Sequence, residues 1–229
     1  DHDIAISNAR LNQPMWVYRG PRITSSIESV RDGRFRSHRA AFRPELSNVG
    51  TSWETGAPQS NVVNRVRQGL TGRALREAVA WDSQAVLHID AMIEPRALRE
   101  SYVRPSDTLT DAWGLPRPQI HYCVDEYSQR GRQAFFDLVK QIYYRLGATD
   151  ADITTYPGWY GAGHVMGTTR MGDDPRTSVT DSYGRTHDHP NLYLVGAGLF
   201  PTVSTVNPTL TLAALALRTA ARLRQQLLG

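Results

Sequence analysis

The spacing of apolar residues along the chain predicts a mixture of strands and helices. Residues 85–94 (AVLHIDAMIE) alternate between apolar and polar side chains, which is typical of a strand. A Pro-rich loop leads into a second predicted strand over residues 119–124, and residues 191–198 (NLYLVGAG) are expected to form a short buried strand that runs into a glycine turn. Asp32-Gly33 lies between two short segments, where it predicts a tight hairpin turn.

Other segments carry apolar residues at helical spacing. A helix is predicted over residues 62–80, although Gly69 and Gly72 interrupt its pattern. A stronger pattern predicts a helix over residues 128–146, with one apolar face and with Gly147 beyond its end as a C-cap.

The chain ends in a predicted helix over residues 208–227. Its first half (TLTLAALAL) is apolar on all sides and is therefore expected to be buried, whereas its second half is amphipathic. Two stretches show no regular pattern: residues 48–61 are expected to be a loop, and residues 148–163 to be irregular.

Composition adds several constraints on the class of protein. With 229 residues, 40% of them hydrophobic and 21% charged, the chain fits a soluble globular protein that can bury a core. The net charge of +4 comes from scattered arginines with acidic residues among them, so nucleic acid is not an expected partner. Because Cys123 is the only cysteine, neither an internal disulfide nor a cysteine-based metal site is expected. No apolar stretch approaches the ~18 residues of a membrane span, so direct insertion into a membrane is not expected either.

The chain lacks the usual fingerprints of a self-sufficient nucleotide site. The stretch GAGLFP has Pro201 where the third glycine of a dinucleotide-binding motif would stand, and neither a phosphate-binding loop nor a nucleophile elbow is present. The chain also begins at Asp1 rather than at methionine. We therefore expect either a processed N-terminus or a part of a longer polypeptide.

The seven histidines differ in the sequence around them. His187 and His189 flank Asp188, which is compatible either with a metal site that needs a further ligand or with a hydrogen-bonded loop, and we favour the loop. The histidines without a partner pattern are expected to be structural or exposed: His2, His38, His88 and His121.

Two polar residues stand out beside glycine or proline turns. His164 opens the stretch HVMGTTRMG, where it could be either a catalytic base or a hydrogen-bonded turn residue. Asn207 precedes Pro208 at the start of the last helix, where Asn is a favoured N-cap. The same helix start could instead stabilise a developing anion, because its N–H groups carry partial positive charge. From these residues alone, both pairs of interpretations stay open.

The segment from His164 to Leu223 resembles the C-terminal signature of the glucose–methanol–choline (GMC) oxidoreductases. Within that superfamily it is most similar to the bacterial branch of gluconate, fructose, sorbitol and glucose FAD dehydrogenases, with pyranose oxidases as more distant relatives. Residues 106–122 (SDTLTDAWGLPRPQIHY) resemble a further segment of the same branch, and residues 20–36 fit its substrate-domain region.

The resemblance assigns roles to particular residues of this chain. His164 falls on the catalytic histidine of the family motif H-x-x-G-T, and Asn207 falls on the second active-site position, which is His or Asn across the superfamily. The cofactor-binding positions implied by the resemblance are Gly196 and Ala197 near the FAD diphosphate, together with Asn207, Pro208 and Thr209 at the helix start against the flavin ring.

The implied reaction is oxidation of an alcohol on a sugar, polyol or sugar acid, with hydride transfer to flavin N5. His164 is expected to be the general base, a role worth ~10²–10⁴-fold in rate, and Asn207 to orient the substrate hydroxyl. The resemblance does not identify the sugar, nor does it distinguish an oxidase from a dehydrogenase. A non-catalytic subunit or sugar-binding module with the same fold is the alternative.

The expected fold class is α+β. Residues 1–155 are expected to form most of a β-rich substrate-binding domain with packed helices, and residues 156–229 to return to an FAD-binding domain that they complete. The N-terminal FAD-binding half, in the same or a separate chain, is therefore an expected partner. Dehydrogenases of this branch also work with a cytochrome or small subunit. The compartment, cytoplasm or periplasm, stays open.

Overall fold

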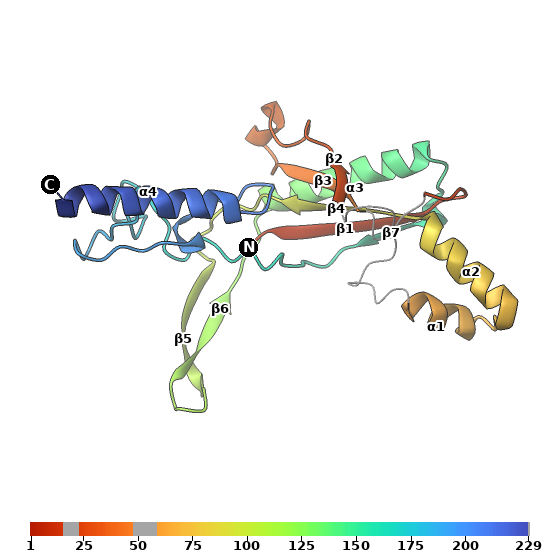
Figure 1. Cartoon of the computed structure of the whole chain (residues 1–229), viewed down its shortest axis with the longest axis horizontal. Coiled ribbons are helices and arrows are strands. Elements are labelled where there is room, and N and C mark those ends of the chain that lie inside the picture. Colours follow the sequence, from red (N-terminus) through yellow and green to blue (C-terminus); the bar gives the residue numbers. More distant parts are fainter. Residues whose placement is uncertain (16–22, 48–58, 229) are drawn as a thin grey trace.

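The computed structural model describes residues 1–15, 23–47 and 59–228. Its centre is a five-stranded antiparallel sheet in the order β2-β3-β4-β1-β7. Helix α3 lies along one face of this sheet, as Figure 1 shows. The strands have these bounds: β1 Asp3–Arg10, β2 Ile23–Ser26, β3 Phe42–Ser47, β4 Val86–Ile93 and β7 Ile153–Tyr156.

The sheet and α3 (Glu126–Arg145) enclose the main hydrophobic core. Along β1 buried and half-buried residues alternate strictly, so every second side chain points toward α3. The sequence predictions for β4 and α3 are confirmed to within two residues. The core consists of Ala5, Ala9, Leu11, Ala40, Phe42, Leu87, Ile89, Ala91, Ile93, Phe135, Val139, Tyr143 and Ala148.

Both ends of α3 carry clear local signals. The Asp125 side chain accepts a hydrogen bond from the Ser128 N–H, so it caps the N-terminus. Gly147 has a φ of 87°, a left-handed conformation that suits glycine just beyond a helix end. Between these ends, a Cβ on Gly131 would come within 2.7 Å of the Ala40 Cβ, so glycine is what lets the helix approach the chain before β3.

The segment from 148 to 163, predicted to be irregular, contains β7, so that prediction is wrong in part. Its residues Ile153–Tyr156 pair with β1 in an antiparallel register. A strand of only four residues, ITTY, is too short to show a periodic pattern of its own. Its place in the sheet depends on β1, which is distant in sequence.

Two strands form a separate hairpin that projects from the body (Figure 1). They are β5 (Tyr102–Thr110) and β6 (Pro116–His121). The prediction of a strand over 119–124 is therefore shifted, because β6 starts before the predicted span and ends at His121.

The predicted helix 62–80 is two helices, so that prediction is corrected. They are α1 (Gln59–Arg67) and α2 (Gly72–Ala85). Gly69 and Gly72, with φ of 86° and 55°, break the helix at the two positions that interrupted its pattern. The loop prediction for 48–61 lies outside the described residues over 48–58, and residues 59–61 belong to α1.

The tight hairpin predicted at Asp32-Gly33 is wrong. β2 and β3 do pair, but Asp32 and Gly33 lie inside the long connection between them, just before the 3₁₀ helix η1 (Arg34–Ser37). The carboxylate of Asp32 accepts a hydrogen bond from the Gly33 N–H at 2.9 Å, a local contact that forms a bend without joining two strands.

The strand predicted over 191–198 is also wrong. This segment holds only an isolated bridge between Tyr193 and Arg185, followed by the 3₁₀ helix η4 (Ala197–Leu199). Val195 is 62% exposed, so the apolar run is not covered as a buried strand would be. In the described part of the chain, no neighbouring strand lies beside it to complete a ladder.

Helix α4 (Thr209–Leu228) confirms the predicted final helix but not its burial. It extends away from the sheet toward the C-terminus (Figure 1). Leu210 and Leu217 are 83% and 72% exposed, and Thr219 is the only buried residue of the helix. The first half of α4 is apolar on all sides, which predicted that other parts of the chain would cover it, but the described residues do not. None of the described helices is long and apolar enough to cross a membrane.

The combination of an antiparallel sheet, a packed helix and further helices confirms the α+β class. The boundary between residues 155 and 156 stays a prediction.

Candidate active site

His164 lies where the start of β1 meets the segment that follows β7. The Ile4 N–H donates to the Tyr160 carbonyl at 2.8 Å, so this segment pairs with the first residues of β1. The carboxylate of Asp1 accepts a hydrogen bond from the His164 N–H at 2.9 Å. The backbone of His164 is therefore held by the edge of the sheet.

The imidazole of His2 connects His164 to a second loop. Its Nδ1 is 3.0 Å from Nδ1 of His164, with the two rings edge to face at 82°. Its Nε2 is 2.5 Å from the carbonyl oxygen of Ser204. Only 1% of His2 is exposed, and this burial lowers the pKa of its imidazole to about 4. His2 is thus a neutral, buried link between His164 and the loop before Asn207.

The loop before Asn207 is held from two sides. The Thr205 hydroxyl accepts a hydrogen bond from Nε of Arg31 at 3.0 Å, in addition to the contact of His2 with Ser204. Val203 and Thr205 are buried. Asn207 itself is exposed, two residues beyond these anchors.

Asn207 does not cap α4, so the N-cap interpretation is corrected. The first intrahelical hydrogen bond runs from the Leu212 N–H to the Pro208 carbonyl at 2.9 Å, which puts Pro208 in the N-cap position. Thr209 is then the first helical residue. Within the described part of the chain, the Asn207 side chain makes no hydrogen bond, so its amide is available to a ligand.

The turn at Gly196 and Ala197 lies against the residues that follow His164. The Gly167 N–H donates to the Ala197 carbonyl at 3.2 Å, and the Thr169 N–H donates to the Gly198 carbonyl at 3.0 Å. Gly196 has a φ of 118°, which favours glycine. The structure therefore links the His164 stretch both to this turn and, through His2, to the loop before Asn207.

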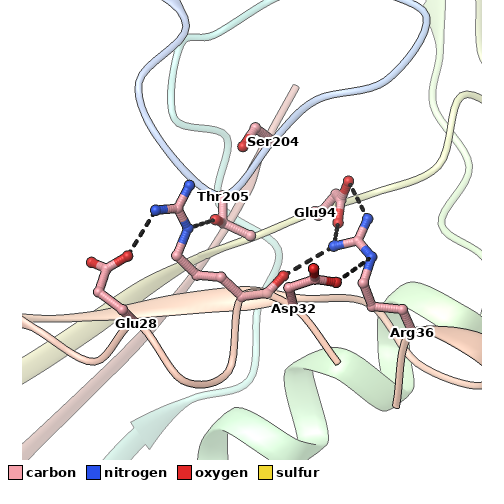
Figure 2. Close-up of a pocket in the computed structure, with 7 residues that line it drawn as sticks. Glu28, Asp32, Arg36, Glu94, Ser204 and Thr205 are labelled. Carbon is pink, nitrogen blue, oxygen red and sulfur yellow. Dashed lines mark hydrogen bonds and ion pairs between the residues drawn. The ribbon is translucent and has the colours of Figure 1, made fainter. Parts of the chain in front are cut away.

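A polar cavity of about 360 Å³ is lined in part by Ser204 and Thr205, in the loop before Asn207. Figure 2 shows its side chains, which are mostly paired with one another: Arg36 contacts both Asp32 and Glu94. The lining residues are Glu28, Arg31, Asp32, Arg36, Glu94, Ser204 and Thr205. Neither His164 nor Asn207 lines it, so this cavity does not enclose the candidate chemistry.

The predicted cofactor positions fit an open surface for a flat group. A Cβ on Gly196 would meet nothing within 4 Å, so a ligand can approach the backbone there. Val165, next to His164, is 68% exposed, and Thr209 in the first turn of α4 is exposed as well. The free N–H groups of that turn suit an electron-rich edge. These residues fit one side of a flavin site, and the described residues do not enclose the other side.

The histidines around Asp188 have local partners. His187 Nε2 is 2.9 Å from the Ser178 hydroxyl, and the His189 N–H donates to the Thr186 hydroxyl at 3.2 Å. Among the described residues, no group of three or more His, Cys, Asp or Glu side chains could hold a metal ion.

Sequence reasoning missed the role of His2 in this site. It expected His2 to be structural or exposed, because nothing near it suggests a partner. The contact with His164 joins residues 162 positions apart, and that with Ser204 joins residues 202 apart. No local spacing can reveal such a pair; only the antiparallel start of β1 beside the 160–164 segment brings it together.

Comparison with known proteins places the chain within one family. The profile described as GMC oxidoreductase matches residues 97–216, a range that includes His164, Gly196 and Asn207. The chain is 34% identical over 212 residues to the fructose dehydrogenase large subunit of Gluconobacter japonicus, covering 91% of this chain and 37% of that protein. It is 39% identical over 168 residues to the gluconate 2-dehydrogenase flavoprotein of Pantoea cypripedii, covering 69% and 27%.

A related oxidase agrees with this placement, and a solved structure agrees with the fold. The paromamine 6'-oxidase of Streptomyces fradiae is 35% identical over 139 residues, which cover 61% of this chain and 26% of that protein. The crystal structure of pyridoxine 4-oxidase from Mesorbium loti superposes with a TM-score of 0.52 at 16% identity, covering 98% of this chain and 42% of that one, and it supports the fold alone. The chain spans less than half the length of each of these proteins.

Proposed function

The chain belongs to the GMC oxidoreductase family, and from that premise we propose that it supplies the catalytic residues and most of the substrate-binding domain of an FAD-dependent enzyme. The proposed reaction is oxidation of an alcohol group on a sugar, polyol or sugar acid. Two relatives, named for fructose and for gluconate, support this substrate class. Residues 1–155 form the substrate-binding part in this proposal, and residues 156–229 return to the FAD-binding domain.

His164 is the proposed general base. One ring nitrogen of His164 faces His2, which leaves the other free to take the proton from a substrate hydroxyl. A base placed in this way typically accelerates proton transfer by ~10²–10⁴-fold. The backbone contact with Asp1 and the ring contact with His2 keep the imidazole in one place while it acts.

Asn207 is the proposed partner for the substrate oxygen. Its amide is exposed and makes no hydrogen bond within the described part of the chain, so it can donate to the hydroxyl oxygen whose proton His164 removes. This oxygen gains negative charge during the reaction, and a nearby donor stabilises that charge. The anchored segment 203–205 limits how far the amide can move.

The proposed cofactor is FAD, with Gly196 and Ala197 toward its diphosphate and Asn207, Pro208 and Thr209 toward its ring. When bound, FAD supplies the acceptor for the hydride. The other side of the cofactor requires residues outside this chain's described surface, so we propose an N-terminal FAD-binding half as the partner. A further subunit or cytochrome is a second proposed partner, because one relative is named as a large subunit.

One observation carries this proposal. Within the segment matched by the family profile, three loops that are separate in sequence converge through backbone contacts and the His2 ring: the His164 stretch, the Gly196 turn and the loop before Asn207. A sugar-binding module without chemistry has no need for an amide that makes no hydrogen bond among the described residues, on a loop tied through His2 to a positioned imidazole.

The test uses the complete flavoprotein under anaerobic conditions with a panel of sugars, polyols and sugar acids. At least one of them is expected to bleach the flavin absorbance, and His164→Ala and Asn207→Ala are expected to slow that bleaching while flavin stays bound. Readmission of air then distinguishes an oxidase, which recovers its colour quickly, from a dehydrogenase. Bound flavin that no member of the panel reduces would contradict the proposed reaction and favour the non-catalytic alternative.

A further inference from the structure

We propose that His2 is a positioning residue that fixes the tautomer of His164, with the proton on Nδ1 and with Nε2 free to act as the base. This inference rests on the proposed function for its consequence in catalysis. Its geometric part, the direction of one hydrogen bond, can be measured without any substrate.

The direction of that hydrogen bond follows from a chain of three groups. The Ser204 carbonyl oxygen can only accept, so Nε2 of His2, at 2.5 Å, must carry a proton and donate it. A neutral imidazole has one N–H, which leaves Nδ1 of His2 as an acceptor. Nδ1 of His164, 3.0 Å away, must then be the donor. The remaining nitrogen of His164, Nε2, consequently has a free lone pair.

The surroundings of His2 keep it neutral and in place. It is 1% exposed, and burial disfavours its charged form, as does the neighbouring His164. The carbonyl of His2 accepts a hydrogen bond from the Ala162 N–H at 3.4 Å, so its backbone is also tied to the segment that carries His164. With His2 buried and neutral, a proton removed from the substrate settles on His164 rather than on His2.

His2 also sets the relative placement of the two proposed catalytic residues. The same ring contacts His164 through one nitrogen and the loop before Asn207 through the other. Because the two ring nitrogens lie at a fixed separation, this one side chain can fix the position of the His164 stretch relative to the loop before Asn207. His2 differs in this from another buried histidine, His88, whose nitrogens contact Asn8 in the adjacent strand and Asp90 in its own strand, so that both contacts stay within the sheet.

Two substitutions separate the two contacts of His2. In His2→Asn, the amide oxygen can replace Nδ1 as the acceptor for His164, but the side chain is too short to reach Ser204. In His2→Gln, the amide nitrogen can replace Nε2 as the donor to Ser204, but no acceptor faces His164. The matched control is His38→Gln, which changes an exposed histidine in the connection between β2 and β3.

The proposal predicts different kinetics for these variants of the complete flavoprotein. His2→Gln is expected to slow flavin reduction by saturating sugar by about 10- to 100-fold, by analogy with the loss seen when the partner that orients a metal-binding histidine is removed. His2→Asn, which loses one hydrogen bond to the loop, is expected to lose only about fivefold. The sugar concentration for half-maximal rate is expected to change little in His2→Gln, and His38→Gln is expected to match the unsubstituted protein.

The direct test is nitrogen NMR of the flavoprotein labelled with ¹⁵N-histidine, without substrate, with the His164 signals identified by their loss in His164→Ala. The expected spectrum has a protonated, pyrrole-type Nδ1 and an unprotonated, pyridine-type Nε2. A protonated Nε2 would overturn the proposal, as would His2→Asn being as slow as His2→Gln in folded, flavin-loaded protein. If Nδ1 carries the proton but no sugar reduces the flavin, the proposed function fails while the inferred positioning stands.

Discussion

The sheet with α3 and the segment from His164 to α4 are ordered in different ways. In the first region, side chains such as Ile89, Phe135 and Val139 are fully buried in a shared core. In the second, most of the chain is irregular and α4 buries only Thr219. Nevertheless, the second region carries every residue that the family resemblance places in the active site.

This difference shows how the candidate site gains its geometry. The 164–208 segment has little core of its own. Backbone hydrogen bonds within the segment hold its loops together, and Asp1, His2 and Arg31 join it to the sheet region. These side chains come from the start of β1 and from the connection between β2 and β3. The sheet therefore serves as the support, while the loops on it carry the proposed catalytic residues.

The largest expected effect is on the free energy of unfolding, which should depend on side chains in the sheet region much more than on those of α4. Phe135→Ala removes a ring that contacts Phe42 edge to face at 5.9 Å, and we expect it to lower the free energy of unfolding of the 229-residue chain by about 3–5 kcal/mol. Leu217→Ala, on the exposed face of α4, is expected to change it by less than about 0.5 kcal/mol. Urea unfolding followed by circular dichroism measures both.

The same two substitutions, Phe135→Ala and Leu217→Ala, can also contradict the difference between the two regions. A cost for Leu217→Ala close to that for Phe135→Ala would show that α4 is packed within the chain and has a core of its own. Phe135→Leu serves as the control, because it keeps an apolar side chain and should cost less than Phe135→Ala.

A smaller effect is expected at the border between the regions, where His2 lies. The folded pKa of His2, about 4, is below its ordinary value of 6.5, so between these values the unfolded chain binds a proton that the folded chain does not. The stability that His2 contributes is therefore present above pH 6.5 and is lost as the pH falls toward 4. Relative to His2→Gln, the unsubstituted chain should lose roughly 2–3 kcal/mol over this window.

Thermal unfolding of both chains at a series of pH values measures this loss. Nearby acids such as Asp1 and Asp3 are common to both chains, so their titration cancels in the difference. A difference that stays constant from pH 7 to pH 4 would mean that His2 is accessible to water and is not a buried link, which would weaken the connection between the two regions.

The sequence was most informative where periodicity is strong. β4 and α3 were predictable because each buries one face in the core, which gives its sequence a regular pattern. The end of α3 was predictable because Gly147 suits the left-handed conformation found there. The short strand β7 and the failed strand at 191–198 were not predictable, because their pairing depends on neighbours distant in sequence. The exposure of α4 was missed because an apolar pattern indicates that a helix has a partner but not where the partner lies.

The candidate site was predictable only where its residues lie close together in the sequence. His164, Asn207 and the Gly196 turn could be identified because the family motif keeps them close in sequence. His2 could not, because its role depends on two contacts across most of the chain. The N-cap role of Asn207 was one of two interpretations that the sequence left open, and the first helical hydrogen bond, which ends on Pro208, corrects it.

The most direct test of the central claim is the pH dependence of anaerobic flavin reduction at saturating sugar, measured by stopped flow in the complete flavoprotein and in His164→Ala. If His164 is the base, the rate in the unsubstituted protein falls along a single ionisation as the pH decreases. The variant should be slower by ~10²–10⁴-fold and should lack that acid limb. The same acid limb in His164→Ala, or a rate close to that of the unsubstituted protein, would contradict the account.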